Sequence, residues 1–76
     1  MASREVERKF DPAAGAVIVT IEDDLGVRSV HTIHVIEPDG SETDVQACIA
    51  TRLREADERS AKVKAAFEKH GWQGLS

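Results

Sequence analysis

The chain has 76 residues and a formal net charge of −4, with 41% hydrophobic and 32% charged side chains. That length predicts one domain near the lower size limit for folding around a single core, and the composition is typical of a globular rather than a disordered protein. The acidic balance disfavours sequence-independent binding to nucleic acid, which needs a basic surface.

Cysteine usage and the amino terminus indicate where the protein is kept. Cys48 is the single cysteine, so an intrachain disulfide is excluded and nothing suggests an oxidising compartment. The first nine residues alternate in charge and lack the apolar stretch of a signal peptide. No apolar run approaches the roughly 20 residues that span a bilayer. We therefore expect a cytoplasmic protein without membrane contact.

The start of the chain allows two interpretations. Val6, Arg8 and Phe10 alternate with charged neighbours, which favours an edge strand over residues 4–10. The turn residues Asp11-Pro12-Ala13-Ala14-Gly15 follow at once and predict a reversal of the chain. Because a third strand stabilises a hairpin that is marginal alone, we favour a three-stranded meander. The alternative is that residues 1–12 form a frayed, charged tail.

Residues 15–37 predict a β-hairpin. The loop Asp23-Asp24-Leu25-Gly26 is typical of a three-residue turn with a glycine bulge, in which Asp23 pairs with Val27. The register that follows sets Glu22 opposite Arg28, Val19 opposite His31, and Val17 opposite Ile33. One face of the hairpin then collects an apolar set suited to covering by a helix: Val17, Val19, Ile21, Ile33 and Val35.

Residues 43–70 predict one long carboxy-terminal helix. Thr43 and Gln46 have the spacing of a capping box, in which Thr43 caps the amide three residues on, and Asp44 falls in the first turn. At the other end, Gly71 occupies the position of a left-handed terminating residue, and Trp72 is expected to pack on Phe67. The predicted fold is therefore α+β: an antiparallel hairpin or three-stranded meander, followed by a helix of about 26 residues and about 39 Å packed on the sheet.

An apolar seam runs along this helix at alternating spacings of three and four: Ile49, Leu53, Ala56, Ser60, Val63 and Phe67. A strand of about eight residues covers only about 26 Å, so the sheet can cover about the first two-thirds of the helix. The apolar residues beyond that point are left without cover. Since exposed apolar patches of this kind usually mark interfaces, we expect a protein partner or a homodimer to contact the distal half of the helix.

The predicted interface combines apolar residues with a charged rim. Its apolar members are Leu53, Ala56, Val63, Ala66, Phe67 and Trp72, and its rim members are Arg52, Arg59 and Lys62. Trp72 is the expected anchor, because a buried tryptophan contributes a large contact area.

No catalytic, cofactor-binding or metal-binding residue is predicted. His31 and His34 lie three apart on a strand, and this odd spacing directs them to opposite faces, so they cannot hold one ion together. Cys48 has no histidine partner assigned by the sequence, and the acidic turn lacks the ligand spacing of a calcium loop.

Two alternatives remain open. A small oligomeric enzyme would use His31, His34 and the acidic turn residues as acid and base, with its site at a subunit interface. Nucleic-acid binding would use the basic residues near the amino terminus: Arg4, Arg8 and Lys9.

The order of these features suggests a family. Asp11-Pro12 opens the hairpin, Pro38-Asp39-Gly40 closes it, and an Ala/Arg/Glu-rich helix ends in Lys69-His70-Gly71-Trp72. In this arrangement, over most of its length, the chain resembles the small accessory proteins of tailed bacteriophages. The resemblance implies either a virion component (a tail, head-tail or capsid-associated protein) or a small cytoplasmic inhibitor of host defence of the anti-CRISPR sort. It assigns no functional residue.

Overall fold

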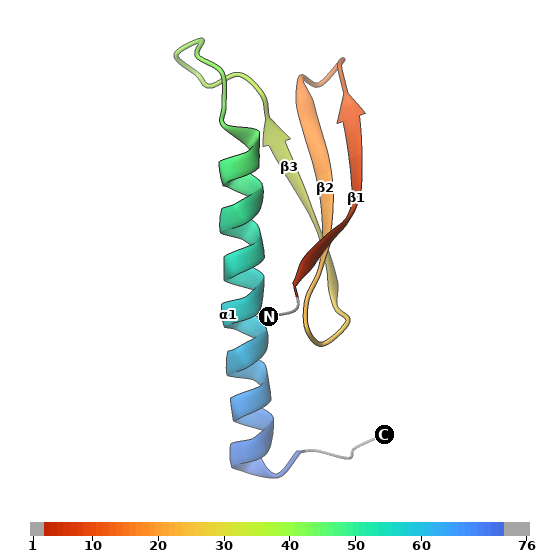
Figure 1. The fold of residues 1–76 in the computed structure, drawn as a ribbon, viewed down its shortest axis with the longest axis vertical. Coiled ribbons are helices and arrows are strands. Elements are labelled where there is room, and N and C mark those ends of the chain that lie inside the picture. Colours follow the sequence, from red (N-terminus) through yellow and green to blue (C-terminus); the bar gives the residue numbers. More distant parts are fainter. Residues whose placement is uncertain (1–2, 73–76) are drawn as a thin grey trace.

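A computed structural model describes residues 3–72 of the chain. These residues form the strands β1 (Arg4–Asp11), β2 (Ala16–Glu22) and β3 (Arg28–His34), followed by the helix α1 (Val45–His70). The strands make one antiparallel sheet in the order β1-β2-β3, and α1 lies along one face of it (Figure 1). The predicted α+β architecture, a three-stranded meander followed by one long helix, is confirmed.

The first strand is an ordered edge of the sheet rather than a frayed tail. Its register against β2 shifts between Glu5 and Glu7, which marks a β-bulge. The backbone N–H of Ser3 donates to the carboxylate of Asp57 on α1 at 3.0 Å, so the start of β1 is tied to the helix. At its other end, the predicted turn is closed by the N–H of Gly15, which donates to the carbonyl of Pro12 at 3.2 Å.

The hairpin of β2 and β3 has the predicted register. Val17 pairs with Ile33, Val19 with His31, and Glu22 with Arg28. The N–H of Asp23 donates to the carbonyl of Val27 at 2.9 Å, and Gly26 adopts the positive φ of 81° that a glycine bulge requires. The carboxylate of Asp23 accepts the N–H groups of Leu25 and Val27 at 2.8 and 2.9 Å, so this acidic side chain serves the turn.

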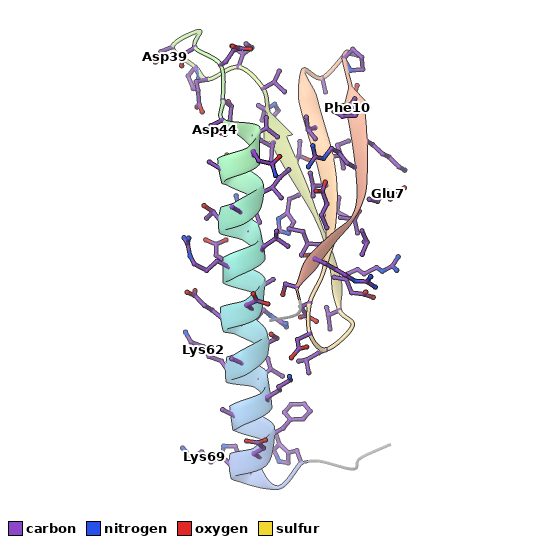
Figure 2. All side chains as sticks on the ribbon, in the orientation of Figure 1. Glu7, Phe10, Asp39, Asp44, Lys62 and Lys69 are labelled. Atoms are coloured by element: carbon purple, nitrogen blue, oxygen red, sulfur yellow. The ribbon has the colours of Figure 1, made fainter. Side chains whose placement is uncertain are left out.

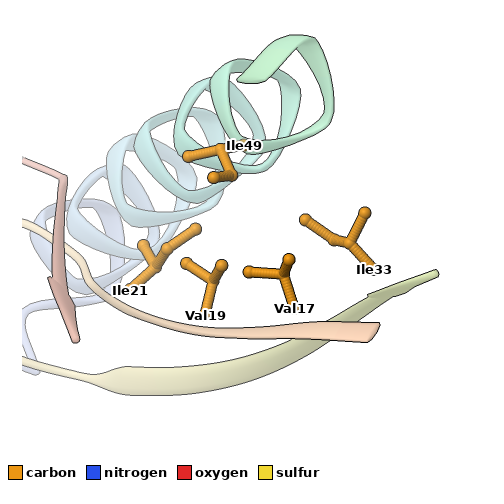
Figure 3. Close-up of a cluster of buried hydrophobic side chains, with 5 residues drawn as sticks. All are labelled: Val17, Val19, Ile21, Ile33 and Ile49. Atoms are coloured by element: carbon orange, nitrogen blue, oxygen red, sulfur yellow. The ribbon is translucent and has the colours of Figure 1, made fainter. Parts of the chain in front are cut away.

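The core is one layer of aliphatic side chains between the sheet and the helix (Figure 3). Its buried members are Val17, Val19, Ile21, Ile33 and Ile49. Half-buried neighbours extend it: Val35, Val45, Cys48, Leu53 and Ala56. The predicted apolar face of the hairpin is therefore the core face, with Val35 at its margin.

The predicted capping box at the start of the helix is wrong by one residue. Asp44 is the N-cap, and its carboxylate accepts the N–H of Ala47 at 3.0 Å. Thr43 instead donates its N–H to the carbonyl of Val35 at 2.9 Å and its hydroxyl to Glu37 at 3.0 Å. Because these bonds keep Thr43 in the connection from β3, Asp44 is the first residue free to cap the helix.

The predicted end of the helix is confirmed. Gly71 has a φ of 67°, and the N–H of Trp72 donates to the carbonyl of Phe67 at 2.9 Å. This is the Schellman pattern, in which a left-handed glycine lets the next residue close back onto the last turn. The rings of Phe67 and Trp72 meet edge to face, with centroids 5.8 Å apart.

Candidate protein-interaction surface

The loop between β2 and β3 fixes how far the helix is supported. Lys64 forms an ion pair with Asp24, and Arg59 forms one with Asp23 at 3.6 Å. In the described part of the chain, Lys64 is the last helix residue with an ion pair or hydrogen bond to the sheet or its loops. About 9 Å of helix continues beyond it, at 1.5 Å per residue. Figure 1 shows this end of α1 extending past the sheet.

An apolar patch, here called the distal surface, runs from the last supported turn of α1 to its end: Val63, Ala66, Phe67 and Trp72. Val63 and Ala66 are half-buried, whereas Phe67 is 44% and Trp72 46% exposed. The imidazole of His70 stacks on the indole of Trp72 with centroids 4.6 Å apart, and the same indole meets the ring of Phe67 edge to face. Because each ring is held by a neighbour, the aromatic part of the distal surface is presented in a defined position.

Of the other predicted interface residues, Leu53 and Ala56 lie against the sheet, whereas Arg59 lines a shallow hollow together with Val63 and Ala66. Leu53 and Ala56 pack against the core of their own chain, because the sheet covers this part of the seam. Arg59 is held by Asp23, and Arg52 pairs with Glu55 at 3.1 Å. Four of the six predicted apolar residues therefore lie at the helix end, and the remaining two are half-buried against the core of their own chain.

Two lysines lie near the distal surface, on the opposite side of α1. Lys62 and Lys69 project from the side of α1 turned away from the sheet (Figure 2). Four of the ten basic side chains of the chain lie after residue 58, but only one of the fourteen acidic side chains does. The helix end is thus basic on a protein whose overall charge is negative.

A second feature is an open hollow between β3 and α1. Its lining includes Asp23, Ser29, His31, Arg52 and Glu55. His31 faces the helix side of the sheet, and its Nε2 lies 2.9 Å from the hydroxyl of Ser29. His34 pairs with Ala16 on the other face, as strand alternation predicts. The two histidines considered for acid–base chemistry therefore do not meet.

Within residues 3–72, no cluster of three or more histidine, cysteine or acidic side chains has an arrangement that could hold a metal ion. In that same part of the chain, no helix is long and apolar enough to cross a membrane. Comparisons with protein-family models, with curated proteins and with solved structures found no match.

Several carboxylates have pKa values below their ordinary range. The Arg8 guanidinium lowers the pKa of Glu5, and the Arg4 guanidinium, followed by Arg28, lowers that of Glu22. The hydroxyl and then the N–H of Ser41 lower the pKa of Asp39, and hydrogen bonding by Ser3 lowers that of Asp57. These carboxylates all lie outside the distal surface, so their effect is on stability.

Proposed function

We propose that this chain is a non-enzymatic protein-interaction module that binds a protein partner through the distal surface. The observation that carries the proposal is the overhang of α1, which continues past its last ion pair with the hairpin loop and ends in two half-exposed aromatic rings, Phe67 and Trp72. Aromatic side chains are enriched among the residues that dominate binding energy, since they bury a large area with little loss of conformational freedom.

The charge of the helix end supports a partner of complementary chemistry. An apolar pocket would receive the aromatic rings, and an acidic rim that reaches around the helix end would face Lys62 and Lys69. A second copy at this surface would place one basic helix end against another, which is unfavourable. We therefore favour a different protein over a homodimer as the occupant of the distal surface.

The resemblance to small phage accessory proteins supports a biological setting for this binding. The first proposal is a role in the virion or its assembly, as a tail, head-tail or capsid-associated protein. The second is inhibition of a host defence complex, in the manner of an anti-CRISPR protein. The location would then be the virion in the first case and the host cytoplasm in the second.

Substitution of the aromatic residues tests the proposal. The tagged chain and its Trp72→Ala variant are each incubated with a lysate of phage-infected host cells, and the retained proteins are quantified by mass spectrometry. We expect a specific partner to bind the Trp72→Ala variant about thirtyfold more weakly, which corresponds to the loss of a 2 kcal/mol hot spot. The same loss is expected for Phe67→Ala.

A matched control distinguishes the loss of an aromatic ring from a disturbance of the helix end. Gly71→Ala strains the left-handed terminating position but keeps both aromatic rings. Gly71→Ala should therefore retain most of the capture, with the helix content of all variants compared by circular dichroism. Partner capture that is undiminished in Trp72→Ala and Phe67→Ala contradicts the proposal.

A further inference from the structure

The sheet has two edges that differ in how well they are protected. The β1 edge has the bulge between Glu5 and Glu7, and charged side chains occupy most of the strand. Bulges and charges are the features by which natural sheets block the addition of another strand. The β3 edge, from Arg28 to His34, has no proline, no acidic residue and no register shift against β2. Among residues 3–72, β3 pairs with β2 alone.

The hydrogen bonds at both ends of β3 show which groups face this open edge. The N–H of Asp23 donates to Val27, and the N–H of Val35 donates to Gly15. Because hydrogen-bonded and non-hydrogen-bonded pairs alternate along an antiparallel ladder, the odd-numbered residues of β3 bond to β2. The even-numbered residues then direct their N–H and C=O groups outward: Arg28, Val30, Thr32 and His34.

We propose that the β3 edge binds the β3 edge of a second copy of this chain, antiparallel, with the two-fold axis at His31. His31 is the centre of β3, so this register overlaps the whole strand with itself. Val30 then pairs with Thr32 of the second copy, and Arg28 with its His34. All outward groups of both strands are satisfied by about eight main-chain hydrogen bonds, and the two sheets become one. Other registers leave some of these groups without a partner.

The side chains of this register favour a second copy as the occupant. On the helix side of the sheet, Val27, which is 49% exposed, meets the half-buried Val35 of the second copy. On the open side, Val30, which is 66% exposed, meets Thr32. Cross-strand pairs of β-branched residues stabilise antiparallel sheets. Since the β1 edges at both ends of the joined sheet are protected, the assembly closes at two chains.

The dimer would change how the distal surface is used, a consequence that rests on the proposed function. A two-fold axis perpendicular to the joined sheet places both α1 helices on the same face and runs them antiparallel. The two distal surfaces then point to opposite ends of the dimer. The dimer would hold two partner molecules at once and connect them.

Disulfide trapping tests the position of the axis. In a Cys48→Ala background, His31→Cys places the two new thiols in directly opposed, non-hydrogen-bonded positions, where Cα atoms are about 4.5 Å apart and a disulfide can form. Ser29→Cys is the matched control on the same face of β3. Its thiols lie about 13 Å apart, because Ser29 is opposite Ile33 in this register. Under mild oxidation, we expect a covalent dimer from His31→Cys but not from Ser29→Cys. Equal cross-linking of the two variants, or none in either, overturns the proposal.

Charge pairs across the axis give a second test. Val30→Lys with Thr32→Lys sets lysine against lysine, whereas Val30→Lys with Thr32→Glu sets lysine against glutamate at the same two positions. Light scattering from micromolar to millimolar concentration should show that the Lys/Lys variant dimerises at least about tenfold more weakly than the Lys/Glu variant and the original chain. A strictly monomeric original chain, or equal dimerisation of the two variants, overturns the proposal. Trp72→Ala should leave dimerisation unchanged, so this result and the partner test fail independently.

Discussion

Asp44 and Thr43 offer a direct test of which residue stabilises the start of α1. Asp44→Ala removes the carboxylate that accepts the N–H of Ala47, and should lower the free energy of unfolding by about 1 kcal/mol. Thr43→Ala keeps the backbone bond to Val35 and loses only an exposed side-chain bond to Glu37, so its effect should be smaller. Urea unfolding followed by circular dichroism measures both. A larger loss for Thr43→Ala contradicts the assignment of the cap.

The same two residues show where prediction from the sequence ends. Both are good capping residues, and local chemistry alone does not distinguish them. The choice is made by a contact eight residues away, between Thr43 and Val35. By contrast, the positive φ at Gly26 and Gly71 was predictable, because the turn and the helix end each require it locally.

The long-range ion pairs were not predictable for the same reason. Lys64 and Asp24 are 40 residues apart in the chain. They meet only because the loop between β2 and β3 lies beside this turn of the helix. The apolar seam could be read from its spacing. How far the sheet covers that seam could not be read in the same way: Leu53 and Ala56, which were predicted at an interface, are half-buried against the core of their own chain.

At the scale of elements, the attachment of α1 to the sheet depends on few side chains. Ile49 is the one apolar residue of the described helix that is fully buried, and it contacts the layer formed by β2 and β3 (Figure 3). Ile49→Ala should therefore lower the free energy of unfolding by about 2–5 kcal/mol, through lost burial and the cavity left behind. In a domain this small, such a loss is a large part of the total stability.

The control for this change is another apolar residue of the sheet. Phe10→Ala alters a side chain that is 70% exposed, and should cost less than about 1 kcal/mol. Urea unfolding of both variants gives the comparison. Similar losses for the two substitutions would mean that the helix is held by contacts other than the core layer.

At the scale of the whole molecule, the elongated shape places the proposed binding surface away from the core. The described part of the chain measures 49 × 21 × 17 Å, and its long axis runs along α1, which continues past the hairpin loop. The core, the β3 edge and the distal surface occupy different parts of this length. Substitutions at the distal surface should therefore change partner binding with little effect on the core.

The stability of the fold at acidic pH depends on carboxylates in several parts of the structure. Their lowered pKa values, as at Glu22 beside Arg4 and at Asp57 beside Ser3, mean that the folded chain binds protons less readily than the unfolded chain. The stabilisation is present above the ordinary carboxylate pKa near 4, and is lost as pH falls through the lowered values. The melting temperature should therefore hold from neutral pH to about pH 5 and fall below about pH 4.

Asp57→Asn isolates one of these contributions. The variant cannot gain or lose charge at this position, so its melting temperature should be lower than that of the original chain at pH 7. At pH 2 the two proteins should converge, because protonation then makes Asp57 as neutral as asparagine. Thermal unfolding followed by circular dichroism over this range gives both curves. Parallel curves, with a constant difference at every pH, would show that Asp57 supports the contact between β1 and α1 by its shape rather than by its charge.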